Sequence, residues 1–382
     1  MKKSNLQNVK TNNRGLILSC ISEGCDTRAE IVKQSGLSKA AVTLIINDFI
    51  AEGRVVEKGA DIDHSVGRPA ITLELVADFC YAVGLCLNRN SISACITDHC
   101  GNAVDQITLP ISDFKTAREI LDRLWEEVLR MAEAKNISTQ KLIGVGVVAP
   151  GPLDYANGVV HNPPNFPLFQ HFNIKEYLHK KTDIPVYLDK GSALYAIADA
   201  RLRKNKYKNA VYVIINEGVG SSLLYKNQIY RGFGGYSGEL GHMTIDVNGP
   251  LCSCGNRGCL ERVISPAYIK EKFGFDKPYS QLVDLCYDRD ESALKVLEYI
   301  ADNLAKALNN VISFIDPDAV VFCGQYNYRN ELLFSMIKER INNYSIVAKI
   351  HPIDVVPALI SENESVSYST SAIMKAYLEQ EL

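Results

Sequence analysis

The sequence from Glu239 to Glu261 reads ELGHMTIDVNGPLCSCGNRGCLE and holds one histidine and three cysteines within eighteen residues. These side chains are His242, Cys252, Cys254 and Cys259. One imidazole and three thiolates form a Cys₃His set, a common tetrahedral shell for zinc. Gly255 and Gly258 would let the backbone turn so that the sulfur atoms converge. Four protein ligands leave no open position, so we predict a structural zinc; three buried free thiols are the alternative.

Two carboxylates flank this cluster. Glu239 precedes His242 by three residues, and Glu261 follows Cys259 by two. Once a metal folds the loop, both carboxylates and the second face of His242 could line one cavity and accept hydrogen bonds from sugar hydroxyls. Alternatively, the carboxylates orient the metal ligands. Spacing does not decide between these two roles.

Short apolar segments alternate with long amphipathic segments on both sides of the cluster. Expected strands cover residues 81–87, 91–97, 102–109, 142–148, 186–188, 211–215 and 319–322. Expected helices cover residues 113–134, 192–203, 291–314, 331–341 and 367–379. This mixture predicts α/β layers.

The N-terminal region has a different pattern. Residues 11–58 predict three helices and the start of a hairpin, with Ser38 capping the third helix. The apolar face of that helix comprises Val42, Ile45, Ile46 and Phe49. A short turn containing Gly36 separates it from the second helix, which is typical of a helix-turn-helix. Alternating segments at 54–58 and 71–75 predict a wing.

The opposite face of the third helix carries small or polar side chains. These are Ser38, Lys39, Ala40, Thr43 and Asn47. Side chains of this kind can reach base edges in the major groove. Lys39 and Arg68 would suit phosphate or minor-groove contacts. We therefore predict a DNA-binding module; a three-helix domain that binds protein is the alternative.

Composition supports an ordinary globular chain. It has 382 residues and a net charge of −3, yet residues 1–60 carry nine Lys/Arg against six Asp/Glu. That local excess points to the N-terminal region as the place for an anionic partner. Eleven cysteines without a secretory leader predict reduced thiols in the cytoplasm. No segment reaches the roughly 18 apolar residues of a membrane span, so no membrane partner is expected.

The metal motif, together with three glycine-containing segments, resembles the ROK family of repressors and sugar kinases. The three segments are residues 149–152, 158–165 and 218–220. The resemblance covers residues 79–382, and the winged module in front resembles the regulator branch. It implies a two-lobed, actin-like ATPase (ribonuclease H-like) fold with sugar between the lobes. It also implies that His242 and the three cysteines bind zinc, that Glu239, His242 and Glu261 contact sugar hydroxyls, and that Asn165 lies in a segment closing over the sugar.

Three departures from the family pattern argue against phosphoryl transfer. The family's kinases have Asn-Asp where this chain has Lys190-Gly191, and glycine cannot accept a proton. Residues 86–90 lack the aspartate and glycines of the first phosphate loop. Glu217 stands where a threonine normally faces phosphate, and its carboxylate would repel nucleotide. Asp189 is the one nearby carboxylate that could replace the base. Lys190 could instead donate to an acidic or phosphorylated ligand.

These observations predict a winged helix-turn-helix at residues 1–75 and a ROK sensor domain at 79–382. Lobe one would comprise 79–187 plus the C-terminal helix 366–382, and lobe two 188–365. We expect no catalytic residues.

The predicted function is a DNA-binding repressor of carbohydrate-utilisation genes with a catalytically inactive kinase-like sensor. Its expected partners are operator DNA, a sugar or sugar derivative, and a second copy of the chain, with tetramers possible. Ligand would change lobe closure and so the spacing of the DNA-binding modules. A sugar kinase that retains a DNA-binding extension and a protein-binding scaffold are the alternatives.

Overall fold

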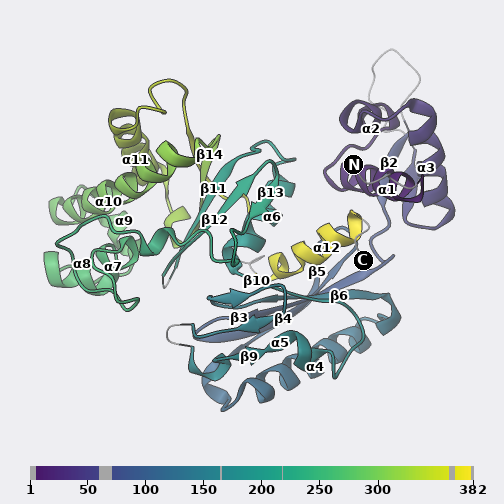
Figure 1. Ribbon diagram of the computed structural model, residues 1–382, viewed down its shortest axis with the longest axis horizontal. Coiled ribbons are helices and arrows are strands. Elements are labelled where there is room, and N and C mark those ends of the chain that lie inside the picture. The colour runs from purple at the N-terminus through teal and green to yellow at the C-terminus, as the bar shows by residue number, and fades with distance from the viewer. Residues whose placement is uncertain (1–5, 60–70, 164–165, 217, 361–365, 380–382) are drawn as a thin grey trace. The chain divides into compact units, whose positions relative to one another are not determined.

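The computed structural model describes residues 6–59, 71–163, 166–216, 218–360 and 366–379, and Figure 1 labels their helices and strands. The chain divides into two compact units, Met1–Lys190 with Asn363–Leu382, and Gly191–Glu362. Among the described residues, no helix has both the length and the hydropathy needed to cross a membrane.

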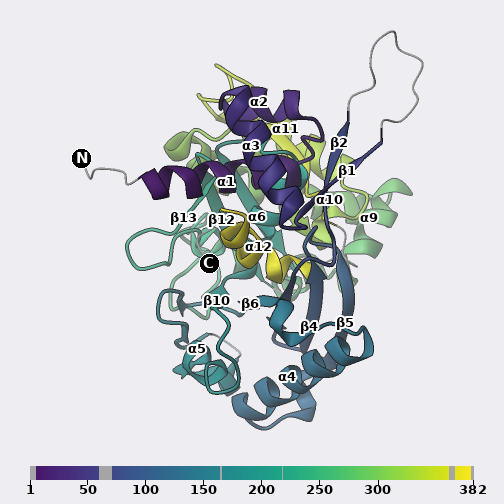
Figure 2. The ribbon, with the colours of Figure 1, turned by 90° about the vertical axis from the view of Figure 1, so that its right-hand side faces the viewer.

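The first unit begins with three helices, α1 (Leu6–Ser22), α2 (Arg28–Ser35) and α3 (Lys39–Ala51). An antiparallel pair of strands, β1 (Val55–Lys58) and β2 (Thr72–Leu75), lies beside them in Figure 2. The predicted apolar face of α3 is entirely buried and packs with Ile17, Ile31 and Leu73. This arrangement confirms the predicted winged helix-turn-helix.

A five-stranded sheet follows in the same unit, in the order β10-β6-β3-β4-β5. Its strands are β3 (Tyr81–Leu87), β4 (Ser91–Asp98), β5 (Ala103–Pro110), β6 (Leu142–Val148) and β10 (Val186–Asp189). β3, β4 and β5 are antiparallel neighbours, whereas β6 and β10 run parallel to β3. The small sheet of β7 (Leu153–Asp154), β8 (Val159–Val160) and β9 (Phe172–Asn173) also belongs to this unit.

Helices cover both faces of the first sheet. Successive side chains of a strand point to opposite faces, and nearly all side chains of β3 and β4 are buried. Val83 and Leu85 pack in one core cluster with α4 (Ala117–Ala134) and α5 (Ile174–Leu178). The other face meets the turn η7 (Ser367–Thr370) and helix α12 (Ser371–Leu378). A Cβ on Gly146 would lie 2.0 Å from the Ser369 carbonyl oxygen, so this approach requires glycine. At the end of α12, Leu378 joins the buried core of the three-helix module.

The second unit contains a sheet with the same pattern, in the order β13-β12-β11-β14-β15. Its strands are β11 (Ala210–Ile215), β12 (Val219–Tyr225), β13 (Gln228–Tyr230), β14 (Ala319–Gly324) and β15 (Asp354–Pro357). Again, three antiparallel strands are extended by two parallel ones. The helices are α6 (Gly191–Leu202), α7 (Leu260–Val263), α8 (Pro266–Phe273), α9 (Tyr279–Tyr287), α10 (Glu291–Ile315) and α11 (Glu331–Tyr344).

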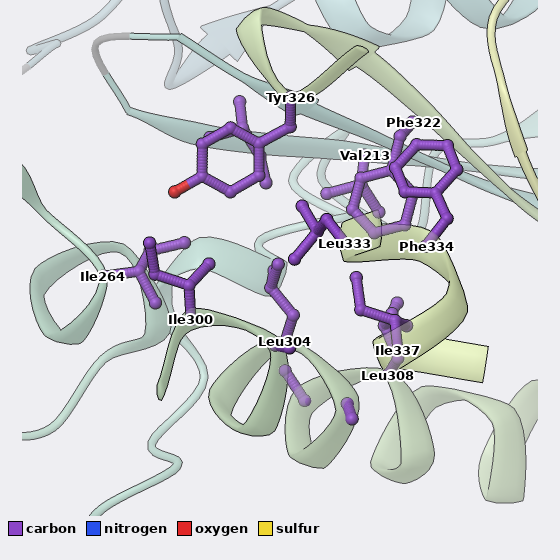
Figure 3. Packing of buried hydrophobic residues seen from close by; sticks show 14 of the residues in the cluster. Val213, Ile264, Ile300, Leu304, Leu308, Phe322, Tyr326, Leu333, Phe334 and Ile337 are labelled. Atoms are coloured by element: carbon purple, nitrogen blue, oxygen red, sulfur yellow. The ribbon is translucent and has the colours of Figure 1, made fainter. Parts of the chain in front are cut away.

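The main core of this unit lies between its sheet and the helices α10 and α11. Figure 3 shows Val213 and Phe322 from the sheet facing Leu304 of α10 and Phe334 of α11. Tyr212, which alternates with Val213, packs on the opposite face with Ala196 of α6. Two sheets flanked by helices confirm the predicted α/β class.

Most predicted bounds hold to within one or two residues, but one helix was placed too early. Residues 111–113 form a 3₁₀ turn, and α4 begins at Ala117 because the Thr116 side chain accepts a hydrogen bond from the Glu119 N–H. The predicted C-terminal helix also divides into η7 and α12. The turn at Ile111–Asp113 is η1, and the other 3₁₀ turns among the described residues are η2 (Thr139–Lys141), η3 (Pro167–Phe169), η4 (Leu240–His242) and η5 (Gln325–Asn327).

Candidate metal centre and DNA-contacting helix

The one histidine and three cysteines of the motif converge in the second unit. The potential ligand atoms of His242, Cys252, Cys254 and Cys259 all lie within 4.8 Å of one another. The Sγ atoms of Cys254 and Cys259 are 3.7 Å apart, and the same distance separates Cys252 Sγ from His242 Nδ1. The structure therefore brings together four groups that can hold a metal ion.

The loop reaches this geometry through its glycines. Gly255 and Gly258 have φ values of 91° and 60°, which side-chain-bearing residues rarely adopt. The Cys252 N–H donates to the Asn256 carbonyl, and the Ile245 N–H donates to the Gly258 carbonyl. These bonds close the loop that carries the three cysteines.

The thiols differ in their acidity. The Asn256 backbone N–H lowers the pKa of the Cys254 thiol, whereas burial raises the pKa of the Cys259 thiol to about 12. A cation among the sulfur atoms would favour the thiolate form of both, because the thiolate is the form that binds metals.

The two flanking carboxylates occupy different places. Glu239 lies at the N-terminal end of η4, and Glu261 lies in the first turn of α7. The Glu261 carboxylate accepts a hydrogen bond of 2.8 Å from the Val219 N–H, at the start of β12. The donor belongs to a strand and is not one of the four potential metal ligands. The bond therefore connects the end of the loop that carries the three cysteines to the sheet.

Glu261 also borders a cavity of 340 Å³ inside the second unit. Tyr279 and Tyr326 line it with rings stacked 4.1 Å apart, and the buried Tyr279 hydroxyl has no hydrogen-bond partner among the described residues. Figure 3 shows the Tyr326 hydroxyl on the side of its ring that faces away from Phe322 and Phe334. These residues were not predicted from the sequence, because two tyrosines 47 positions apart give no signal of proximity.

Of the other expected ligand-binding residues, Lys190 belongs to the first unit. Lys190 follows β10 in the first unit, and its N–H donates to the buried Asp189 carboxylate at 2.8 Å. A Cβ on Gly151 would lie 3.4 Å from Lys190 Cδ, so the Lys190 stem passes near the loop at residues 149–152. Asn165 and Glu217 lie outside the described residues.

The expected DNA-contacting residues lie at the start and on the outer face of α3. Lys39, Ala40 and Asn47 are exposed. Ser38 is exposed too, but its hydroxyl accepts a hydrogen bond from the Ala41 N–H and caps the helix. The half-buried Thr43 donates its hydroxyl to the Lys39 carbonyl at 2.9 Å. Arg68 lies outside the described residues.

Two residues that were not predicted from the sequence also contribute to this surface, Leu44 on α3 and Arg28 on α2. Leu44 is exposed on the same face of α3 as Ala40 and Asn47. The Arg28 guanidinium donates to Asn47 Oδ1 at 3.3 Å and is itself paired with Glu57. Helical spacing could have identified Leu44, since it follows Ala40 by four positions and precedes Asn47 by three.

Comparisons with known proteins extend over both units. A sequence model of the ROK family matches residues 82–371. The xylose repressor of Bacillus spizizenii is 26% identical over 377 residues, covering 97% of this chain and 96% of the repressor. The glucokinase of Thermotoga maritima is 24% identical over 310 residues, covering 76% of this chain and 96% of the glucokinase.

A solved ROK-family transcriptional regulator, described as a homolog of the Escherichia coli Mlc protein, has the same fold. Its TM-score is 0.80 at 22% identity, and 97% of each chain is covered. This likeness includes the N-terminal module and confirms the predicted winged helix-turn-helix ahead of a two-lobed, actin-like domain. Because the family model matches well over half of the sequence, the chain belongs to the ROK family.

Proposed function

We propose that this protein is a DNA-binding transcriptional repressor of carbohydrate-utilisation genes. The observation that carries this proposal is the extent of the matches. The xylose repressor matches 97% of the chain, including the winged module, whereas the glucokinase matches 76%. The exposed, polar start of α3 supplies a surface suited to the major groove.

The kinase-like domain acts in this proposal as a sensor without catalysis. Gly191 begins α6 at the position where the family's kinases carry their base. The Asp189 carboxylate accepts a hydrogen bond from the Lys190 N–H, and its side chain is buried. A positioned base typically accelerates a reaction about 10²–10⁴-fold, so a domain without one would transfer a phosphoryl group far more slowly.

The effector in this proposal is a sugar or sugar derivative. Its proposed contacts are Asn165, Lys190, Glu239, His242 and Glu261. Carboxylates and an imidazole accept hydrogen bonds from hydroxyls, and the Lys190 ammonium would favour an acidic or phosphorylated ligand. Effector can regulate DNA binding only if it binds two states of the protein with different affinities.

We also propose that the metal is a structural zinc. Zn–S bonds of about 2.3 Å in a tetrahedron place two sulfur atoms about 3.8 Å apart. The observed separation of Cys254 and Cys259 is 3.7 Å. Four protein ligands leave no site for an activated water, so the ion would fix the loop that carries Glu239 and Glu261.

A homodimer, which could pair further into a tetramer, would present two winged modules to a two-fold operator. The proposed domains are the winged module at 1–75 and the sensor at 79–382, with lobe one at 79–187 and 366–382 and lobe two at 188–365. The two compact units of the structure meet nearby in the sequence, at Lys190–Gly191, and the winged module belongs to the same unit as lobe one.

Binding of the full chain to its own promoter DNA tests the repressor function. We expect specific binding that weakens by at least about 10³-fold between 50 and 200 mM salt if six or more phosphates are contacted. Lys39→Ala should weaken binding to all sequences alike, while Lys270→Ala in the second unit serves as the matched control.

Two results would contradict the proposal. One is the absence of salt-sensitive promoter binding both with and without candidate sugars. The other is sugar-dependent release of ADP from ATP, abolished by Asp189→Asn, which would make the chain a kinase with a DNA-binding extension.

A further inference from the structure

Helix α3 exposes one large apolar side chain. Leu44 is 64% exposed, whereas Val42, Ile45 and Ile46 of the same helix are buried. Ala40 and Asn47 are exposed as well, and their spacing places them on the same side of the helix as Leu44. We call Ala40, Leu44 and Asn47 the α3 face. A single exposed leucine is common on protein surfaces, so its surroundings must decide whether it has a partner.

The charges near the α3 face favour an anionic partner. In the described part of the winged module, the arginines and Lys58 are all paired with carboxylates. Lys33 and Lys39 have no ion pair there, and they lie on either side of the turn at Gly36, which leads into α3. Two lysines without ion pairs at the turn that leads into α3 suit a phosphate backbone better than they suit an apolar patch of a protein.

Asn47 determines which kind of hydrogen bond the α3 face can make. Its Oδ1 accepts a hydrogen bond from Arg28, and Glu57 holds Arg28 in place at 2.7 Å. The amide oxygen is therefore engaged, and the Nδ2 group remains available as a donor. With one lone pair of its oxygen already engaged, the Asn47 side chain is oriented to donate from Nδ2 to an acceptor on a base edge.

We propose that Leu44 packs against the C5-methyl group of a thymine in the major groove of the operator, while Asn47 donates to an acceptor beside it. This inference rests on the proposed DNA-binding function and specifies what the helix reads. Thymine is the base that presents a methyl group in the major groove, and its O4 is an acceptor. Cytosine offers an amino donor at that position, which would oppose the Asn47 amide.

The test uses an operator fragment located by footprinting the full-length protein on its promoter. Each thymine is replaced in turn by deoxyuridine, which keeps O4 and the base pair and removes the methyl group. For the wild-type protein, we expect one position in each half-site to lower the affinity about fourfold, the factor expected for one buried methyl group. For Leu44→Ala, the same replacement should change the affinity less than 1.5-fold.

The matched control is Leu16→Ala, because Leu16 is also an exposed leucine, at 41%, but lies on α1. It should keep the full uracil sensitivity of the wild type. Leu44 is exposed, so its replacement should leave the melting temperature unchanged and the comparison valid. Equal uracil sensitivity of the wild type and Leu44→Ala overturns the inference while leaving DNA binding intact. Failure of the wild type to bind DNA overturns the proposed function instead.

Discussion

A single glycine shows how tightly the metal loop is packed. Gly258 has a φ of 60°, and a Cβ at this position would lie 1.6 Å from the Asp246 carbonyl oxygen. The clash is with backbone, so no side-chain rotation relieves it. Gly274 also has a positive φ, 68°, but nothing lies within 4 Å of its Cβ position. Alanine variants at Gly258 and Gly274 therefore distinguish the effect of backbone strain alone from the effect of a clash within the loop that carries the three cysteines.

Gly258→Ala should lose the metal and Gly274→Ala should keep it. We expect about one zinc per chain in the wild type and in Gly274→Ala, with the latter destabilised by about 1–2 kcal/mol through its left-handed backbone. Gly258→Ala should resemble Cys254→Ser, which removes a ligand. Metal analysis and thermal unfolding measure both effects. Full zinc content in both Gly258→Ala and Cys254→Ser would show that the Cys₃His set is not the metal site.

At the scale of elements, the sequence predicted those features that depend on local pattern. Alternation placed β1 and β2 to within one residue, and the apolar spacing of α3 identified its buried face. Prediction was poorer where one side chain sets a boundary, because capping by Thr116 moves the start of α4 to Ala117. The sequence also predicted that Ser38 caps α3, and the structure confirms it, since the Ser38 hydroxyl accepts a hydrogen bond from the Ala41 N–H.

Ser38 allows its capping role to be separated from its proposed DNA contact. Ser38→Ala should lower the stability of the winged module by about 0.5–2 kcal/mol, because it removes the side chain that accepts the Ala41 N–H. Ser38→Asp keeps a capping oxygen, and its charge suits a helix N-terminus, so the melting temperature should be retained.

The aspartate would nevertheless repel phosphate. We therefore expect Ser38→Asp to bind promoter DNA at least about tenfold more weakly than the wild type at low salt, with a smaller deficit at high salt. Fluorescence anisotropy with labelled DNA gives both affinities. Wild-type affinity in Ser38→Asp would mean that the start of α3 lies away from the DNA backbone.

At the scale of the molecule, the sequence predicted the fold class but not its internal repetition. Both sheets have three antiparallel strands extended by two parallel ones. The two sheets share this strand order but no short sequence repeat, so the repetition could not be recognised from the sequence. The tyrosine-lined cavity was missed for a related reason, since its residues meet through packing of distant segments. The Cys₃His cluster was predictable because its four side chains lie within one short segment of the sequence.

Helix α12 packs against both the winged module and the first sheet. Ile373 of α12 packs with Ala82 of the sheet, and Leu378 is buried in the core of the winged module. The Arg54 guanidinium also lies 5.6 Å from the ring centroid of Tyr377. A helix shared by two cores can carry a change in one to the other, so DNA binding and effector binding should be coupled.

Coupling of this kind must be reciprocal. A thermal-shift screen of a neutral pentose, an acetamido sugar and a sugar phosphate should identify a stabilising effector. If that effector lowers operator affinity by a given factor, typically about 5–150-fold, saturating operator must lower effector affinity by the same factor. Calorimetry with and without each partner measures both factors, and a sugar that gives no thermal shift is the control. A stabilising sugar with a coupling factor of one would contradict the sensor function, because its binding would then not distinguish the DNA-bound protein from the free one.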